Sequence, residues 1–264
     1  MPVRLLIAAL AVVAVGLFAL GYARDESAFA IAGAPVFFVA AALFVLRPQL
    51  EWRYYRRRPS DLDAPLVGLF DAKLPAYYRE GSAEERLRFR QETFLAERAL
   101  DFRGQGFGDA EVPADLAALV ASQLARVTAA DPETHVLPPF ENVVLYRHAF
   151  PSPQHPETWH HSELYAEDGV LIFNLERAVP GIFEPHAYFN VVLYEWCRVA
   201  ALTGFAPTPA RDAERARDWA GVCEREARRP GTWVTEAVGL GEELIDGAAV
   251  LRVLRMEGLL AAAP

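Results

Sequence analysis

The hydrophobic pattern of the chain changes abruptly near residue 58. Before that point lie two long runs without a charged residue, 5–23 and 28–46, separated by a polar segment of four residues. Each run has about the 20 residues that an α-helix needs to cross the hydrocarbon core of a bilayer. A cleaved signal peptide would explain the first run alone, but a second run follows it almost at once. The pattern therefore predicts a transmembrane helical hairpin in residues 1–58.

Positive charge follows the second run. Five arginines stand there against one acidic residue, Glu51: Arg47, Arg53, Arg56, Arg57 and Arg58. The segment between the runs has one arginine and two acids, and Arg4 precedes the first run. By the positive-inside rule, both flanks of the hairpin stay in the cytoplasm. We therefore predict a two-pass protein of the inner (cytoplasmic) membrane whose soluble domain is cytoplasmic. Arginines at the membrane surface can also bind anionic lipid headgroups.

Residues 59–264 have the mixed pattern of a globular α+β domain with a small β-sheet. Periodic apolar positions predict helices over 66–78, 82–98, 113–130, 209–228 and 241–257. Ser82 and Glu85 form a capping box at the start of the second. Strand-like runs occupy 142–146, 163–165 and 170–174, and the last two flank the turn Glu167-Asp168-Gly169. The Gly-rich segment 103–108 lacks the lysine of a phosphate-binding loop, so we interpret it as a turn.

One stretch, 187–203, is apolar almost all round and predicts a buried central helix starting soon after Pro185. Tyr194, Glu195 and Arg198 stand on it at i, i+1 and i+4. Zinc metallopeptidases place His, Glu and His at these positions, so that two imidazoles bind the metal and the glutamate activates a water. Here only the glutamate is present. A small sheet beside a buried helix is consistent with a zincin-like arrangement.

Four segments between residues 66 and 205 carry a resemblance to a known family. They are LPAYYREGSAEERLRFRQETFLAERALDFRGQGF, ENVVLYRHAFPSP, HSELYAEDGVLIFNLERA and the FNVVL that precedes Tyr194. In order and spacing they resemble the Mlc titration factor A (MtfA) family of bacterial zinc-dependent peptidases. The resemblance covers about half of the chain and implies a zincin-like fold. The hairpin lies outside it, and the tail after residue 205 matches weakly.

The resemblance assigns roles residue by residue. The first zinc-ligand histidine of the family falls on Tyr194, its catalytic glutamate on Glu195 and its second ligand histidine on Arg198. The third ligand of the family is a glutamate from a later helix. It falls near Glu242 or Glu243, and no motif chooses between them. A neutral phenol binds zinc poorly, and a guanidinium has no lone pair to donate. We therefore predict that no zinc or other metal is bound. On a helix, Arg198 can instead form an ion pair with Glu195.

Two functional interpretations stay open. In the first, the chain is a pseudopeptidase that binds a regulatory protein or a peptide at the membrane. In the second, it is a hydrolase with an altered site around Glu195, to which Cys197 or a histidine would contribute; we interpret His160 and His161 as residues of a solvated loop and Cys197 as a small buried residue. Two cysteines suit a reducing cytoplasm. A net charge of −9 argues against a nucleic-acid partner.

Overall fold

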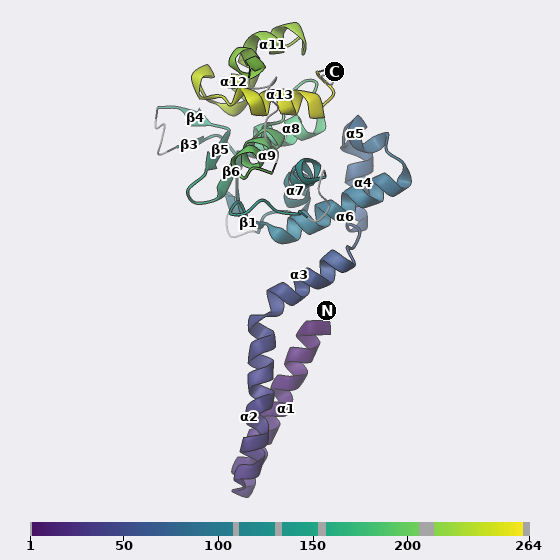
Figure 1. Ribbon diagram of the computed structural model, residues 1–264, viewed down its shortest axis with the longest axis vertical. Coiled ribbons are helices and arrows are strands. Elements are labelled where there is room, and N and C mark those ends of the chain that lie inside the picture. The colour runs from purple at the N-terminus through teal and green to yellow at the C-terminus, as the bar shows by residue number, and fades with distance from the viewer. Residues whose placement is uncertain (1, 108–110, 130–133, 153–156, 206–213, 261–264) are drawn as a thin grey trace. The chain divides into compact units, whose positions relative to one another are not determined.

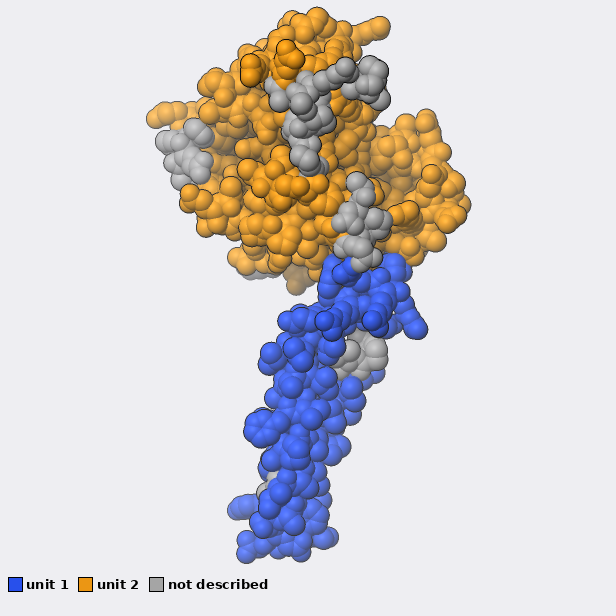
Figure 2. All heavy atoms as spheres, in the orientation of Figure 1, with its two compact units in different colours: residues 1–60 blue, residues 61–264 orange. Residues whose placement is uncertain are grey.

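The computed structural model describes residues 2–107, 111–129, 134–152, 157–205 and 214–260. The chain forms two compact units, residues 1–60 and residues 61–264 (Figures 1 and 2). The boundary lies two residues beyond the one drawn from the sequence.

The first unit consists of three helices, α1 (Pro2–Arg24), α2 (Ser27–Val45) and α3 (Arg47–Arg57). The α1 and α2 helices pack along each other, and α3 contacts both. The first two match the apolar runs, and they are long and apolar enough to cross a membrane. Their apolar side chains are largely exposed, unlike those of a core helix in a soluble protein. The third helix was not predicted.

The second unit contains a small mixed sheet. Its strands are β1 (Asp101–Gln105), β2 (Asn142–Tyr146), β5 (Ser162–Tyr165) and β6 (Val170–Asn174), in the order β1-β2-β6-β5. The strands β1, β2 and β6 are parallel to one another, and β5 pairs antiparallel with β6 at the edge of the sheet. Gly169 turns the β5–β6 hairpin with a φ of +62°, a conformation that favours glycine, so the predicted hairpin is confirmed. A separate pair, β3 (Phe150–Pro151) and β4 (Trp159–His160), was not predicted.

Helices make up most of the remainder of this unit. They are α4 (Ala64–Lys73), α5 (Ala76–Arg79), α6 (Ala83–Ala99), α7 (Ala114–Thr128), α8 (Leu175–Phe183), α9 (Val191–Leu202), α11 (Trp219–Arg225), α12 (Thr232–Val238) and α13 (Gly247–Met256), with the short 3-10 helices η1 (Ala216–Asp218) and η2 (Glu242–Leu244). The predicted capping box starts α6: Ser82 Oγ accepts the Glu85 N–H at 3.2 Å, and Glu85 Oε2 accepts the Ser82 N–H at 2.7 Å. The α+β class is confirmed.

Two predictions in the first half of this unit were wrong. The single helix over 66–78 is in fact α4 and α5, because Leu74 adopts an extended conformation before Pro75. The Gly-rich segment interpreted as a turn begins inside β1, which pairs in parallel with β2 from Asp101 to Gln105. Its polar sequence has no apolar alternation, so only the pairing with β2 makes it a strand.

The central helix begins later than predicted. Residues 187 and 188 belong to a turn whose N–H groups both donate to the Glu184 carbonyl. The helix α9 starts at Val191, because Asn190 caps it by accepting the Leu193 N–H at 3.0 Å. Pro185 therefore belongs to a turn and does not start the helix.

The C-terminal helices also differ from the prediction. Residues 206–213 lie outside the described part, and the rest of the predicted 209–228 helix is η1 and α11. The last helix begins at Gly247 rather than 241, because Asp246 caps it through the Ala248 and Ala249 N–H groups. The helices α8 and α12 were not predicted.

The core of the second unit lies on one face of the sheet. The residues that β2 and β6 turn toward it are fully buried: Val143, Leu145, Leu171 and Phe173. The helix α9 packs on β5 and β6, and α7, α8 and α13 surround it (Figure 1). Its residues from Val191 to Cys197 are all buried. The predicted buried central helix is therefore confirmed, apart from its start.

Candidate functional site

Glu195 lies at the centre of the candidate site. Its side chain is fully buried on α9, where the sheet edge and α13 meet the helix. Its Oε1 accepts a hydrogen bond from Ser162 Oγ of β5 at 2.8 Å. Its Oε2 accepts one from Arg198 Nη1 at 2.7 Å. The predicted ion pair between Glu195 and Arg198 is therefore present, and the carboxylate raises the pKa of Arg198.

Tyr194 is as deeply buried as its neighbour. Its hydroxyl oxygen accepts the backbone N–H of Asp246 at 3.0 Å, which ties the central helix to the start of α13. Burial raises the pKa of Tyr194 well above its usual range, so the phenol is neutral at physiological pH. The Arg198 guanidinium carbon lies 5.6 Å from the centre of the Tyr194 ring. The ring and the carboxylate together hold the guanidinium in place.

The acidic residues between positions 242 and 246 lie in different environments. Glu242 and Glu243 belong to η2 and are exposed, where they line a hollow with Arg217 and Trp219. Asp246 is the carboxylate close to the motif, since its charge acts on both Tyr194 and Arg198. Sequence analysis missed it, although an Asp just before a helix rich in apolar residues is an N-cap signal.

The groups around Glu195 do not fit a zinc ion. Both carboxylate oxygens have hydrogen-bond donors, and one of these donors is a cation. A second cation beside Arg198 would be repelled, and the protonated phenol of Tyr194 is a poor ligand. In the described part of the chain, no group of three or more His, Cys, Asp or Glu residues could hold a metal ion. The residues around Glu195 therefore do not form a zinc site.

Contrary to the prediction, His160 and His161 are not in a solvated loop. His160 is fully buried on β4, because pairing with β3 turns its ring inward beside Phe150 and within hydrogen-bonding distance of Thr158. His161 is half-buried, its Nδ1 lies 3.0 Å from Asn174 Nδ2, and burial lowers its pKa. His155 lies outside the described residues, and His186 is exposed.

Cys197 does not have the setting of a nucleophile. It is buried on α9, and burial raises the pKa of its thiol to about 12. A nucleophilic cysteine needs a lowered pKa and some exposure, so that a thiolate forms and meets substrate. Cys197 has neither, which agrees with the interpretation of a small buried residue.

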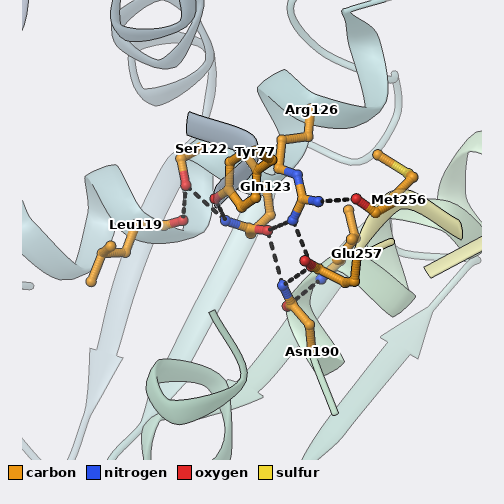
Figure 3. Close-up of polar contacts among 9 residues, drawn as sticks. Tyr77, Leu119, Ser122, Gln123, Arg126, Asn190, Met256 and Glu257 are labelled. Carbon is orange, nitrogen blue, oxygen red and sulfur yellow. Dashed lines mark hydrogen bonds and ion pairs between the residues drawn. The ribbon is translucent and has the colours of Figure 1, made fainter. Parts of the chain in front are cut away.

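A second polar cluster holds the start of α9, and sequence analysis did not find it (Figure 3). Arg126 of α7 donates to Glu257 Oε1 at 2.6 Å, to Gln123 Oε1 at 2.9 Å and to the Met256 carbonyl at 2.9 Å. The amide of Asn190 donates to the same oxygens of Gln123 and Glu257, each at 3.0 Å. The exposed fractions of the Arg126 and Glu257 side chains are 6% and 2%.

This cluster joins three segments that are distant in the sequence. Arg126 and Glu257 are 131 positions apart, and Asn190 lies between them at the cap of α9. The Arg126 guanidinium carbon also lies 3.8 Å from the centre of the Tyr77 ring. The side chains of this cluster bond to one another and to the Met256 carbonyl, so we interpret the cluster as structural.

The chemical capacity of the site follows from these contacts. A glutamate that acts as a general base needs a free oxygen facing the proton that it takes, and Glu195 has both oxygens engaged inside a buried pair. The resemblance to a peptidase family rests on the sequence segments alone. Searches of protein-family models, of curated proteins and of solved structures found no match to this chain.

Proposed function

We propose that this chain is a membrane-anchored pseudopeptidase: a zincin-like relative of the MtfA zinc peptidases that has lost catalysis and binds a regulatory protein or a peptide at the cytoplasmic face of the inner membrane. One observation carries the proposal. The carboxylate at the position of the family's catalytic glutamate is bonded by Ser162 and by the Arg198 guanidinium. A permanent cation thus takes the place of a metal as the partner of Glu195.

The arrangement of the second unit supports the zincin-like part of the proposal. A mixed sheet ends in an antiparallel edge strand, β5, and the buried helix that carries the motif packs beside that strand. Ser162 of β5 and Glu195 of α9 touch directly. Such a unit keeps the framework of a site while its reactive groups bond to one another.

The first unit supports the anchor and its orientation. Two helices of bilayer length are followed by five arginines within twelve residues, a bias that keeps the following unit in the cytoplasm. A pseudopeptidase held there would act on partners close to the membrane, because anchoring raises their effective concentration. The acidic balance of the chain favours a protein or a peptide over nucleic acid.

The second interpretation, a hydrolase with an altered site around Glu195, requires that one carboxylate oxygen be released from its present partner. None of the contacts among the described residues favours that release. The hydrolase therefore enters the test as the contrary outcome.

The test measures metal and activity on the purified full chain. Cells grown with added zinc should yield protein with far less than one zinc per chain, and it should not cleave a mixed peptide library. Tyr194→His combined with Arg198→His restores the ligand spacing, so its zinc content is the positive control. One zinc per chain in the natural protein, or cleavage that is lost in Glu195→Gln, would overturn the proposal.

A further inference from the structure

One face of the helix α3 combines arginines with a leucine and a tyrosine. Leu50, Arg53, Tyr54 and Arg57 stand at i, i+3, i+4 and i+7, so they share one side of the helix, and Arg58 follows at its end. These five residues line a hollow of about 570 Å³. We call them the α3 pocket.

Within the described ranges of the chain, no acidic side chain pairs with the arginines of the α3 pocket. Arg47, outside the pocket, pairs with Glu51 at 3.0 Å. Among the described residues, Arg53, Arg57 and Arg58 form neither an ion pair nor a side-chain hydrogen bond. Three guanidinium groups around one hollow repel one another, and an anion between them relieves that repulsion. The pocket therefore suits an anion that accepts several hydrogen bonds, because each guanidinium group can donate two parallel hydrogen bonds to such an anion.

The position of the pocket indicates which anion it binds. The helix α3 follows α2 after a single residue, Leu46, so it begins where a helix of bilayer length ends. At that level the available anions are phospholipid headgroups, whose phosphates are linked to apolar chains. Leu50 and Tyr54 give the same pocket an apolar wall, and a tyrosine is typical of the membrane interface.

We propose that the α3 pocket binds the phosphate headgroup of an anionic phospholipid of the cytoplasmic leaflet. The three guanidinium groups hold the phosphate, and Leu50 and Tyr54 contact the glycerol and the first part of the acyl chains. The inference rests on the proposed membrane anchor. It goes beyond that anchor because it assigns a lipid class to a defined set of side chains.

The test compares variants of equal net charge in the full chain, purified in a neutral detergent. Native mass spectrometry during titration with phosphatidylglycerol, and separately with phosphatidylcholine, gives the apparent affinity for each lipid. In the pocket variant, Arg53, Arg57 and Arg58 are each replaced by Gln. In the control variant, the exposed Arg79, Arg88 and Arg228 are replaced by Gln, which removes the same charge elsewhere.

We expect the natural protein and the control variant to prefer phosphatidylglycerol to the same extent. The pocket variant should lose affinity for it on the order of 100-fold, since each arginine near a membrane surface contributes about fivefold. Phosphatidylcholine should bind all three equally. Replacing the three pocket arginines by Lys keeps the charge but removes the forks, so affinity should fall several-fold.

Two results would overturn the proposal even if the pocket variant loses affinity. One is equal loss of phosphatidylglycerol affinity in the pocket and control variants, which would indicate diffuse electrostatics. The other is full displacement of the lipid by millimolar inorganic phosphate, or binding of glycerol phosphate as tight as that of the lipid, which would indicate a site for a free anion.

Carbonate extraction separates this inference from the anchor on which it rests. If carbonate extracts the natural protein from membranes, the anchor itself fails, and the inference fails with it. If natural and pocket-variant proteins both resist extraction while their lipid affinities are equal, the headgroup site alone fails. Resistance of both with a loss of affinity in the pocket variant supports both.

Discussion

Replacing Arg198 by methionine tests the ion pair that, in the proposed pseudopeptidase, takes the place of a metal site. The change keeps much of the side-chain volume but removes the donor that lies 2.7 Å from Glu195 Oε2. Glu195 is fully buried, so its charge would be left with the Ser162 hydroxyl as its remaining donor. Breaking a buried pair by removing one partner costs about 3–5 kcal/mol, because it leaves an uncompensated charge.

The structure places this case at the lower end of that range. Ser162 still donates to Oε1, and 24% of the Arg198 side chain is exposed, so water can approach the vacated position. We expect a loss of about 3 kcal/mol in the free energy of unfolding. In a unit of this size that corresponds to a fall in Tm of roughly 6–12 °C.

The assay is denaturant and thermal unfolding of the full chain in detergent, followed by tryptophan fluorescence. Arg103→Met is the matched control, because its pair with Asp101 is 3.0 Å long but 69% and 58% of the two side chains are exposed. It should change stability by less than about 1 kcal/mol. Adding Glu195→Gln to Arg198→Met removes the orphaned charge and should restore more than half of the loss. If Arg198→Met is no less stable than Arg103→Met, Glu195 does not depend on Arg198 and the reasoning is wrong.

Three further predictions concern other parts of the chain. Arg126→Met should lower the free energy of unfolding by about 3–5 kcal/mol, since Glu257 and Gln123 lose a buried donor; an effect below about 1 kcal/mol in the same assay would refute the structural role of this cluster. Cys197 and Cys223, whose thiol pKa values burial raises to about 12, should resist iodoacetamide at pH 8 in the folded protein and react once it is unfolded. A C-terminal alkaline phosphatase fusion should be inactive if the arginines after α2 place the second unit in the cytoplasm as we propose, and strong phosphatase activity would contradict this topology.

Local signals in the sequence were sufficient for some elements. The two apolar runs, the capping box at Ser82 and the turn at Gly169 each depend on residues within a few positions of one another, and all three are present. The pair of Glu195 and Arg198 belongs to the same class, because three residues along a helix bring side chains together whatever surrounds them.

Contacts between distant segments were not predictable in the same way. The strand β1 exists because β2, some forty residues later, pairs with it. Ser162 meets Glu195 across 33 positions, and nothing in either local sequence indicates the contact. The local sequence around Arg126 predicts an exposed arginine. In the structure its side chain is buried, because the segment that carries Glu257 packs against it. Such groups are set by tertiary packing, so no periodic pattern marks them.

Two sets of polar contacts also explain how so apolar a helix as α9 is oriented. One joins Glu195 to Ser162, and the other joins Asn190 to Gln123 and Glu257. From Val191 to Cys197 the helix is buried on every side, so the burial of apolar area alone does little to select one rotation over another, since the hydrophobic effect is not directional. A shift of one residue would rotate it by about 100°. That rotation would take Glu195 away from Ser162 and Asn190 away from Gln123 and Glu257, leaving buried polar groups without partners. Because these contacts connect α9 to the sheet, to α7 and to Glu257, they specify its orientation. A glutamate that orients α9 in this way needs neither a metal nor a substrate, which explains the presence of Glu195 in the proposed pseudopeptidase.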